Sequence, residues 1–369
     1  MKKLWHIFLG IVNMLLAVAM LLSSFGGTVS PETSVIPALA AMMLPLILPL
    51  MLVALVTSVF ISWRAAVFNL VVLLCCSGAI LNICPLNFNS GKLIAASDPS
   101  TRFSLMTYNL MGLSNYKNNS ADTIYPRTET VEYLINSGCD MIAYQEAYNL
   151  HDGHYPEVRP EMMARLRETY PYLARGRNAY VGLLSKYPVK EIPINLADTH
   201  SFFVGCYEVD INGTKVTVVN VHLQSIGLNK DDKTLYRDLT KGEMMNVDTV
   251  RSTLLHKLKL AFKARARQGI KLRHYINELK GPVIVCGDFN DIPGCYAERA
   301  IMGHDLHDAY REAGLGPAVT YRADRFYFRI DQILYRGLTP LKTRVRNNGF
   351  SDHFPVTAIF STNPDLNIN

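Results

Sequence analysis

The hydrophobic pattern divides the chain into two parts that meet near residue 95. Before this point charged residues are almost absent, and three apolar runs occupy residues 4–25, 38–61 and 65–85. Each run has the roughly 20 residues that a helix needs to cross about 30 Å of hydrocarbon. We therefore expect residues 1–94 to form a membrane anchor with three transmembrane helices. A cleaved signal peptide is the alternative for the first run, but that run exceeds a typical signal core and two further spans follow it.

Beyond residue 95, short β-branched runs alternate with polar stretches and with helical patterns. Helical spacing predicts helices at residues 126–138 and 160–170, and a long helix with a basic face within 226–280. The clearest hairpin has Asn212-Gly213 at its turn. We expect strands at residues 103–110, 140–147, 179–189, 282–290, 329–335 and 353–360, and two strands of the hairpin within 203–223 on either side of residues 211–214. Helices between mostly antiparallel hairpins predict an α/β sandwich of packed sheets covered by helices, with residues 361–369 as a frayed tail.

Polar residues stand at the ends of several predicted strands. Alone, an Asp at such a position is usually a turn or helix cap, and a lone His is usually a satisfied edge residue. Together they are costly to bury unless they pair with one another or bind a ligand. The set comprises Asn109, Glu146, His222, Asp288, Asn290, Asp331, Asp352 and His353. We therefore expect these remote positions to converge on one site.

The chemistry of this set is that of a hard-cation site. Four carboxylates, two amides and two imidazoles without cysteine suit Mg²⁺ or Mn²⁺. This set offers neither the thiolates nor the clustered histidines that zinc prefers, and the seven cysteines of the chain show no C-x-x-C spacing. It has no G-x-S-x-G nucleophile elbow and no P-loop. An activated water that hydrolyses a phosphate ester is the expected chemistry.

These blocks of residues also resemble a known family. In chain order they are similar to the signature blocks of the endonuclease/exonuclease/phosphatase superfamily: TYNL, AYQEA, VVNVHLQ, VIVCGDFND, RIDQILY and SDHFPV. The resemblance covers about residues 100–360 and omits the apolar segment. It implies that residues 95–369 form a catalytic domain with the deoxyribonuclease I-like fold, a two-sheet α/β sandwich preceded by the three transmembrane helices.

The resemblance also implies a role for each matching position. Glu146 would be the principal Mg²⁺ ligand, Asn109 would bind beside it or support it from further out, and Asp352 would complete the metal environment. His353 would act on the scissile phosphate as general base or transition-state stabiliser, and Asp331 would orient it.

The remaining three positions would complete the reaction. Asp288 is the rival to His353 for orienting or deprotonating the attacking water. Asn290 would donate to a phosphate oxygen. His222 would donate to the phosphate or protonate the leaving group.

The position of His222 narrows the substrate class. The resemblance implies that deoxyribonuclease-like and sphingomyelinase-like members carry a histidine here, whereas abasic-site endonucleases do not. The inositide-phosphatase signatures, a Trp before the GD block and a CDRI block, are absent. We expect a metal-dependent phosphodiesterase acting on a nucleic acid or a phospholipid. A phosphomonoesterase of inositide type and a catalytically idle binding domain are the alternatives, and no protein partner is predicted.

Charge predicts the orientation in the membrane. Lys2, Lys3 and Arg64 flank the apolar runs on one side, and the loop between the first two runs has no Lys or Arg. Positive charge marks the cytoplasmic side, so a multi-pass protein with an extracytoplasmic catalytic domain is expected.

The basic stretch within 226–280 can be interpreted in two ways. It contributes Lys257, Lys259, Lys263, Arg265 and Arg267 to a formal net charge of +6. Either these residues meet lipid head groups or a nucleic acid backbone, or they form a solvated helix face.

Overall fold

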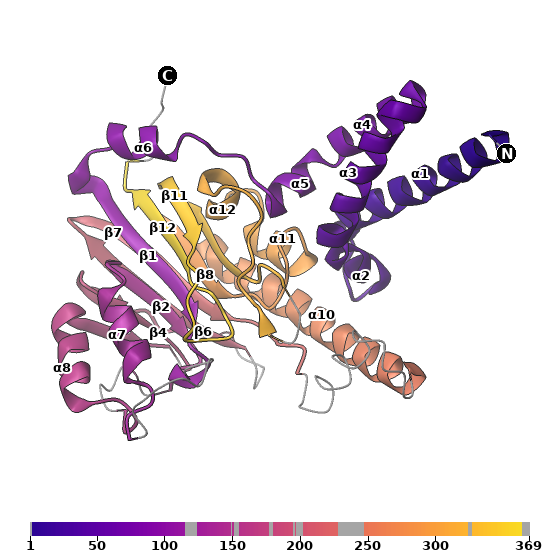
Figure 1. The fold of residues 1–369 in the computed structure, drawn as a ribbon. Helices are drawn as coiled ribbons and strands as arrows, with labels where there is room; N and C mark the ends of the chain where they lie inside the picture. The colour runs from indigo at the N-terminus through magenta and orange to yellow at the C-terminus, as the bar shows by residue number, and fades with distance from the viewer. Residues whose placement is uncertain are drawn as a thin grey trace.

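The computed structural model describes residues 2–114, 124–148, 150, 155–176, 180–194, 196, 202–227, 247–323 and 327–363. Residues 228–246 of the charged insertion and 364–369 of the predicted tail lie outside the described residues. In the described part an arm of apolar helices projects from a two-layered β-sandwich (Figure 1).

The first sheet has six strands and mixed pairing. Its strands are β1 (Arg102–Asn109), β2 (Met141–Gln145), β3 (Tyr172–Arg175), β4 (Val181–Ser185), β11 (Thr339–Val345) and β12 (Val356–Ser361). They lie in the order β11-β12-β1-β2-β4-β3, with β1 parallel to β2 and the other neighbours antiparallel. Arg102 is in register with Ser361, so the first strand of the sandwich pairs with the last.

The second sheet repeats this plan. Its strands are β5 (Val189–Glu191), β6 (Phe203–Ile211), β7 (Thr214–His222), β8 (Val283–Asp288), β9 (His307–Asp308) and β10 (Asp331–Arg336). They lie in the order β5-β6-β7-β8-β10-β9, and here the parallel neighbours are β7 and β8. The predicted turn of the β6–β7 hairpin is confirmed, because Asn212 and Gly213 have φ angles of 52° and 90°.

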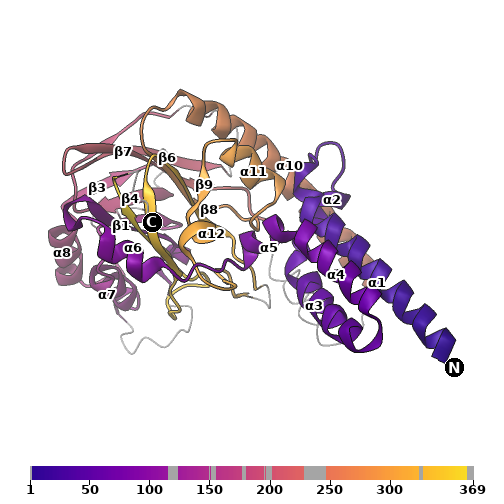
Figure 2. The same ribbon diagram turned by 90° about the horizontal axis from the view of Figure 1, so that it is seen from above.

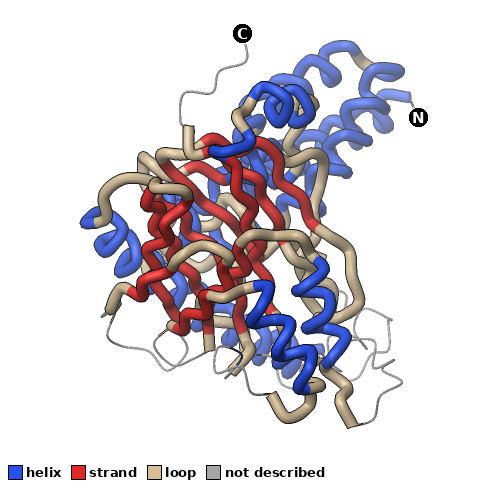
Figure 3. The backbone as a smooth tube through the Cα atoms, turned by 90° about the vertical axis from the view of Figure 1, so that its left-hand side faces the viewer, coloured by secondary structure: helices blue, strands red, loops and turns tan. Residues whose placement is uncertain are grey.

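Helices cover both outer faces of the sandwich. The helices after the arm are α6 (Ser90–Ala96), α7 (Thr128–Asn136), α8 (Pro160–Thr169), α10 (Val247–Glu278), α11 (Tyr296–Met302) and α12 (Ala309–Ala313). Seen from above, α7 and α8 lie on one side of the sheets and α10 and α11 on the other (Figure 2), and the strands form the centre (Figure 3). The predicted α/β sandwich is confirmed.

Three apolar clusters hold these layers together. Residues such as Leu105 and Ile284 fill the space between the two sheets. Val131 of α7 and Leu166 of α8 pack on the outer face of the first sheet. Leu272 of α10 packs with the second sheet. Apolar side chains on both faces of each sheet therefore pack into these clusters. The polar residues at the strand ends take no part in this packing and are available to form the site.

The apolar arm differs from the expected three spans. It contains α1 (Lys2–Phe25), α2 (Ile36–Met42), α3 (Leu44–Ile61), α4 (Trp63–Cys75) and α5 (Ser77–Ile83), with the short 3-10 helix η1 (Gly26–Thr28) after α1. Two helices, in residues 7–28 and 44–61, are long and apolar enough to cross a membrane. A third span exists only if α4 and α5, which are bent by 66°, are counted as one.

The expected second span, residues 38–61, is divided at Met43. Pro37 and Pro45 each lie in the first two positions of a new helix, where a proline costs nothing because those N–H groups have no helical partner. Only Pro49 lies inside a helix. The prolines therefore start helices here, whereas the sequence pattern suggested one continuous helix that tolerates them.

Candidate functional site

The site lies where the two parallel strand pairs end. Asn109 and His222 are the last residues of β1 and β7, Asp288 is the last residue of β8, and Glu146 directly follows β2. Because parallel strands have their carboxyl ends at the same edge of a sheet, each pair delivers two polar residues to one place. Asp331 joins them because it opens β10 in register with Asp288.

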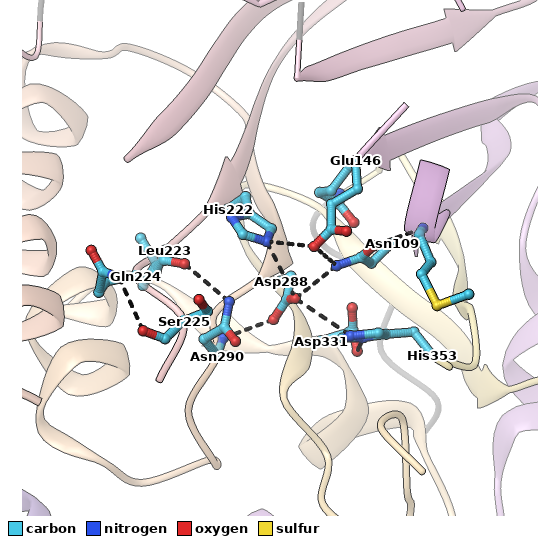
Figure 4. Close-up of polar contacts among 12 residues, drawn as sticks. Asn109, Glu146, His222, Leu223, Gln224, Ser225, Asp288, Asn290, Asp331 and His353 are labelled. Atoms are coloured by element: carbon cyan, nitrogen blue, oxygen red, sulfur yellow. Dashed lines mark hydrogen bonds and ion pairs between the residues drawn. The ribbon is translucent and has the colours of Figure 1, made fainter. Parts of the chain in front are cut away.

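Asp288 is the central residue of the cluster. Its Oδ2 accepts a hydrogen bond from Asn109 Nδ2 at 3.0 Å and lies 3.7 Å from His222 Nε2 and 3.6 Å from His353 Nε2. Its Oδ1 accepts the backbone N–H of Asn290 at 2.8 Å. Figure 4 shows these contacts radiating from Asp288. The sequence placed both histidines at the site but did not indicate that one carboxylate lies between them.

Glu146 is the second carboxylate of the cluster. Its Oε1 accepts hydrogen bonds from Asn109 Nδ2 at 2.9 Å and from His222 Nε2 at 3.1 Å. Burial would raise the pKa of Glu146, but the hydrogen bond and charge of His222 and the Asn109 amide outweigh it and lower the pKa to about 2. With 30% of its side chain exposed, against 2% for Asp288, Glu146 is an ionised carboxylate that solvent can reach.

The backbone at Glu146 is held in a conformation that non-glycine residues rarely adopt. Its φ is 58°, and that of Asn290 is 52°. The Glu146 N–H donates to Tyr180 O at 2.9 Å, which fixes the turn after β2. Strained residues of this kind cluster at functional sites. The backbone strain at Glu146 and Asn290 therefore accompanies the orientation of their side chains in the site.

His353 is held from one side by Asp331. Its Nδ1 lies 2.8 Å from Asp331 Oδ2, and the Asp331 N–H donates to Thr320 Oγ1 at 3.0 Å. Burial would lower the pKa of His353, but the charges of Asp331 and Asp288 outweigh it and raise the pKa to about 10. The predicted pairing of His353 with Asp331 is therefore present, and it favours a protonated imidazole at neutral pH.

The two amides support the carboxylates. Asn109 Oδ1 accepts the Met111 N–H at 3.0 Å, so its Nδ2 must point at Glu146 and Asp288. This orientation fits the supporting role expected for Asn109 better than direct metal binding. Asn290 Nδ2 donates to Leu223 O at 3.0 Å and so joins the loops after β7 and β8.

Asp352 lies at the same pocket but outside the tight cluster. Its Oδ1 accepts a hydrogen bond from Ser351 Oγ at 3.3 Å, and its side chain lines the cavity with Glu146 and His353. The neighbouring pair Asp352-His353 precedes β12 by a short loop rather than opening the strand, because β12 begins at Val356.

The donor atoms of the cluster fit a divalent cation. Within the described residues, two groups offer ligand atoms that all lie within 4.8 Å of one another: Glu146, His222 and Asp288, and Asp288, Asp331 and His353. Carboxylate oxygens with a single imidazole suit Mg²⁺ or Mn²⁺. Neither group contains a thiolate. The first group, which includes the partly exposed Glu146, is the better candidate.

Several residues of the site carried no signal in the sequence. Tyr180 packs edge-on against His222 with ring centroids 5.2 Å apart, and Tyr321 lies 4.9 Å from the His353 ring. Arg265, expected on a basic helix face, is instead 1% exposed, pairs with Asp291 at 3.1 Å and lines the cavity. Partners distant in the chain bury these side chains, and a local pattern does not encode such partners.

Comparison with known proteins assigns this chain to a family. The model of the Endonuclease/Exonuclease/phosphatase family matches residues 106–353, and a model described as a domain of unknown function matches residues 6–83. No curated protein matches the chain.

The chain is also similar, at low sequence identity, to several solved structures. The endonuclease/exonuclease/phosphatase from Bacteroides vulgatus is 15% identical, with 71% of this chain and 99% of that chain covered and a TM-score of 0.46. Truncated Caenorhabditis elegans TDP2 is 18% identical, with 70% and 98% covered and a TM-score of 0.45. ANGEL2, a 2′,3′-cyclic phosphatase, is 16% identical, with 70% and 95% covered and a TM-score of 0.44.

Proposed function

Because the chain belongs to the endonuclease/exonuclease/phosphatase family, we propose that it is a membrane-anchored, divalent-metal-dependent phosphodiesterase that uses an activated water. One observation carries the proposal: Glu146, Asp288 and two histidines from both sheets converge on one cavity. A cluster of ionisable groups in a cleft, with strongly perturbed pKa values, is typical of catalytic sites.

Glu146 is the residue that would hold the cation, with Asp288 and His222 beside it. Mg²⁺ or Mn²⁺ bound there would polarise a phosphoryl oxygen and lower the pKa of a water. Asn109 would hold the two carboxylates in place through its Nδ2, and Asp352 would contribute from the rim.

The protein's own residues divide the proton chemistry between them. His353 is raised in pKa by Asp331 and Asp288, so it would serve as a charged donor that stabilises the phosphoryl oxygens. Asp288 Oδ2, which faces both imidazoles, is then the residue that takes the proton of the attacking water. His222 would donate to the leaving oxygen, and the second N–H of Asn290 would donate to a phosphoryl oxygen.

The test is hydrolysis of bis(p-nitrophenyl) phosphate by the full chain in detergent. We expect activity with Mg²⁺ or Mn²⁺, loss of that activity on addition of EDTA, and loss in His353→Ala. Activity that persists in EDTA, or that His353→Ala leaves unchanged, contradicts the proposal. Absence of all activity favours a binding domain, and hydrolysis of p-nitrophenyl phosphate alone favours a phosphomonoesterase.

The proposal extends to the arrangement in the membrane. Residues 1–94 would form the anchor and residues 95–369 the catalytic domain, with the amino terminus and Arg64 on the cytoplasmic side. A reporter fused after residue 95 should therefore lie outside the cytoplasm. A cytoplasmic reporter signal would overturn the orientation and leave the chemistry untouched.

A further inference from the structure

The apolar arm is docked on the catalytic sandwich beside the site. Glu32, between η1 and α2, pairs with Arg267 and lies 3.5 Å from Lys263 Nζ, both on α10. Ala41 of α2 packs with Ile292 and Cys295 in one apolar cluster. The basic face of α10 is therefore used in part to hold the arm.

The backbones of the arm and the sandwich approach closely. A Cβ atom on Gly27 would lie 1.8 Å from the carbonyl oxygen of Gly294, so this contact requires glycine. At the other end of the arm, Arg311 donates to the Gly78 carbonyl at 3.1 Å, and Arg329 donates to the Asn82 carbonyl at 2.9 Å. Specific contacts therefore hold the arm against the sandwich both near Gly27 and near Gly78 and Asn82.

Docking brings Met42 of α2 to the wall of the catalytic cavity. The cavity of about 220 Å³ has a polar side that contains Glu146, Asp288 and both histidines. Apolar side chains make up much of the remaining wall: Met42, Ile226, Ile292, Phe328 and Ile330. The site is therefore built from both parts of the chain, and the residue that comes from the arm is apolar.

The apolar wall is close in the chain to a helix that is long and apolar enough to cross a membrane. α3 begins at Leu44, two residues after Met42, and its side chains at Leu46 and Leu50 are 58% and 53% exposed. With 18 residues, α3 is about 27 Å long, close to the thickness of a bilayer core. With α3 in a bilayer, Met42 and the cavity wall that it forms would therefore lie near the bilayer surface.

We propose that the cavity binds a phosphodiester bearing a long apolar substituent, a phospholipid of the bilayer in which the arm is embedded. The substituent contacts the wall formed by Met42, Ile292 and Phe328, and the phosphate faces Glu146 and Asp288. This inference rests on the proposed phosphodiesterase activity and names its substrate class. A nucleic acid strand would contact this wall only through the faces of its bases, and it has no alkyl chain to pack against Met42 and Ile292.

The test uses p-nitrophenyl alkyl phosphodiesters with methyl, butyl or octyl groups and the full chain in nanodiscs with Mg²⁺. The leaving group and reaction are the same throughout, so only the apolar contact changes. Each methylene group that becomes fully buried can raise kcat/KM by up to about fourfold. We expect kcat/KM to rise at least about tenfold from methyl to butyl, and Met42→Ser to reduce this rise by about fivefold.

Met43→Ser is the matched control. Met43 is the adjacent residue, is 41% exposed and does not line the cavity, so it should keep the wild-type chain-length dependence. Met42→Leu should restore most of the dependence, which separates a lost contact from a misfolded protein. A flat chain-length series in the wild type, or equal effects of the two serine variants, overturns the inference.

The source of the substrate is tested with a hexadecyl ester. We expect faster hydrolysis when ester and enzyme share a nanodisc than when the ester is supplied in separate, enzyme-free nanodiscs. Equal rates, or a higher kcat/KM on plasmid DNA than on any alkyl ester, overturn the bilayer assignment. Absence of hydrolysis for every ester with every metal overturns the proposed function itself, so the two failures are distinguishable.

Discussion

Nδ1 of His353 lies 2.8 Å from Oδ2 of Asp331, and this contact joins the loop before β12 of the first sheet to the start of β10 in the second. The Asp331 carboxylate fixes the orientation of the imidazole and directs Nε2 toward Asp288, 3.6 Å away. The position of this imidazole therefore depends on how the two sheets pack on one another.

Asp331→Asn should lower kcat by about 100-fold to 10,000-fold, because the amide removes the charge that favours protonated His353. The thermal midpoint should change little, since the amide can still accept from Nδ1. The measurement is kcat at saturating Mg²⁺ together with a melting curve. Asp210→Asn, on an exposed hairpin, is the control, and an Asp331→Asn variant within threefold of wild type would refute the assigned role.

Glu146→Gln should abolish the stabilisation that a bound cation gives to the folded protein. In the wild type, Mn²⁺ at 100 times its Kd should stabilise the fold by about 2.7 kcal/mol. The variant should show almost none of this, with activity reduced by more than about 100-fold and the melting point without metal unchanged. Differential scanning fluorimetry against Mn²⁺ concentration measures the effect. Glu161→Gln, on the exposed side of α8, should behave as wild type, and a metal-responsive Glu146→Gln would exclude Glu146 as a ligand.

Gly287→Ala should destabilise the sandwich by more than about 2 kcal/mol. Gly287 has φ of 142°, and a Cβ atom there would lie 1.9 Å from the Val221 carbonyl oxygen on the neighbouring strand. The added methyl group must push β7 and β8 apart directly beside Asp288. Gly91→Ala in α6, where nothing lies within 4 Å, is the control and should be neutral or slightly stabilising. Equal melting points for both variants would contradict this account.

The free energy of unfolding of Glu298→Gln, relative to that of the wild type, should increase as the pH rises. Burial and the charge of Asp308 raise the pKa of Glu298 to about 7, from 4.5 in the unfolded chain. The folded state therefore retains its proton over this interval while the unfolded state loses it, so the wild type loses stability between about pH 4.5 and pH 7.

Glutamine keeps an acceptor for the Gly294 N–H and carries no proton to lose. The stability of the variant relative to wild type should rise by about 1–3 kcal/mol between pH 5 and pH 8. Melting points measured across this range test the claim. A difference that stays constant with pH would show that Glu298 ionises normally.

The sequence pattern was sufficient for those parts of the fold that repeat with a local period. Alternation located β6 and β7, and the polar residues after β1, β2, β7 and β8 identified the cluster, because the ends of parallel strands meet at one edge. β3, β5, β9 and β11 were not predicted, since their pairing depends on partners elsewhere in the chain. The single strand expected over residues 179–189 is wrong, because this stretch forms β4 in one sheet and begins β5 in the other.

The features that the sequence did not reveal depend on long-range packing. The amide orientation of Asn109 is set by two carboxylates from other strands and by the turn at Met111. Arg265 is buried because Asp291, 26 positions away, pairs with it. Met42 reaches the cavity only because the arm docks on α10. None of these side chains has a distinguishing local pattern.

The pairing of Arg102 with Ser361 has a consequence for biosynthesis. The amino-terminal strand of the sandwich leaves the ribosome with one edge unpaired and waits for nearly the entire remaining chain before its neighbour is made. Contacts this remote in the chain form slowly, and an unpaired strand edge promotes aggregation. A nascent chain that stalls before residue 353 would therefore be inactive and would still need a chaperone to shield that edge.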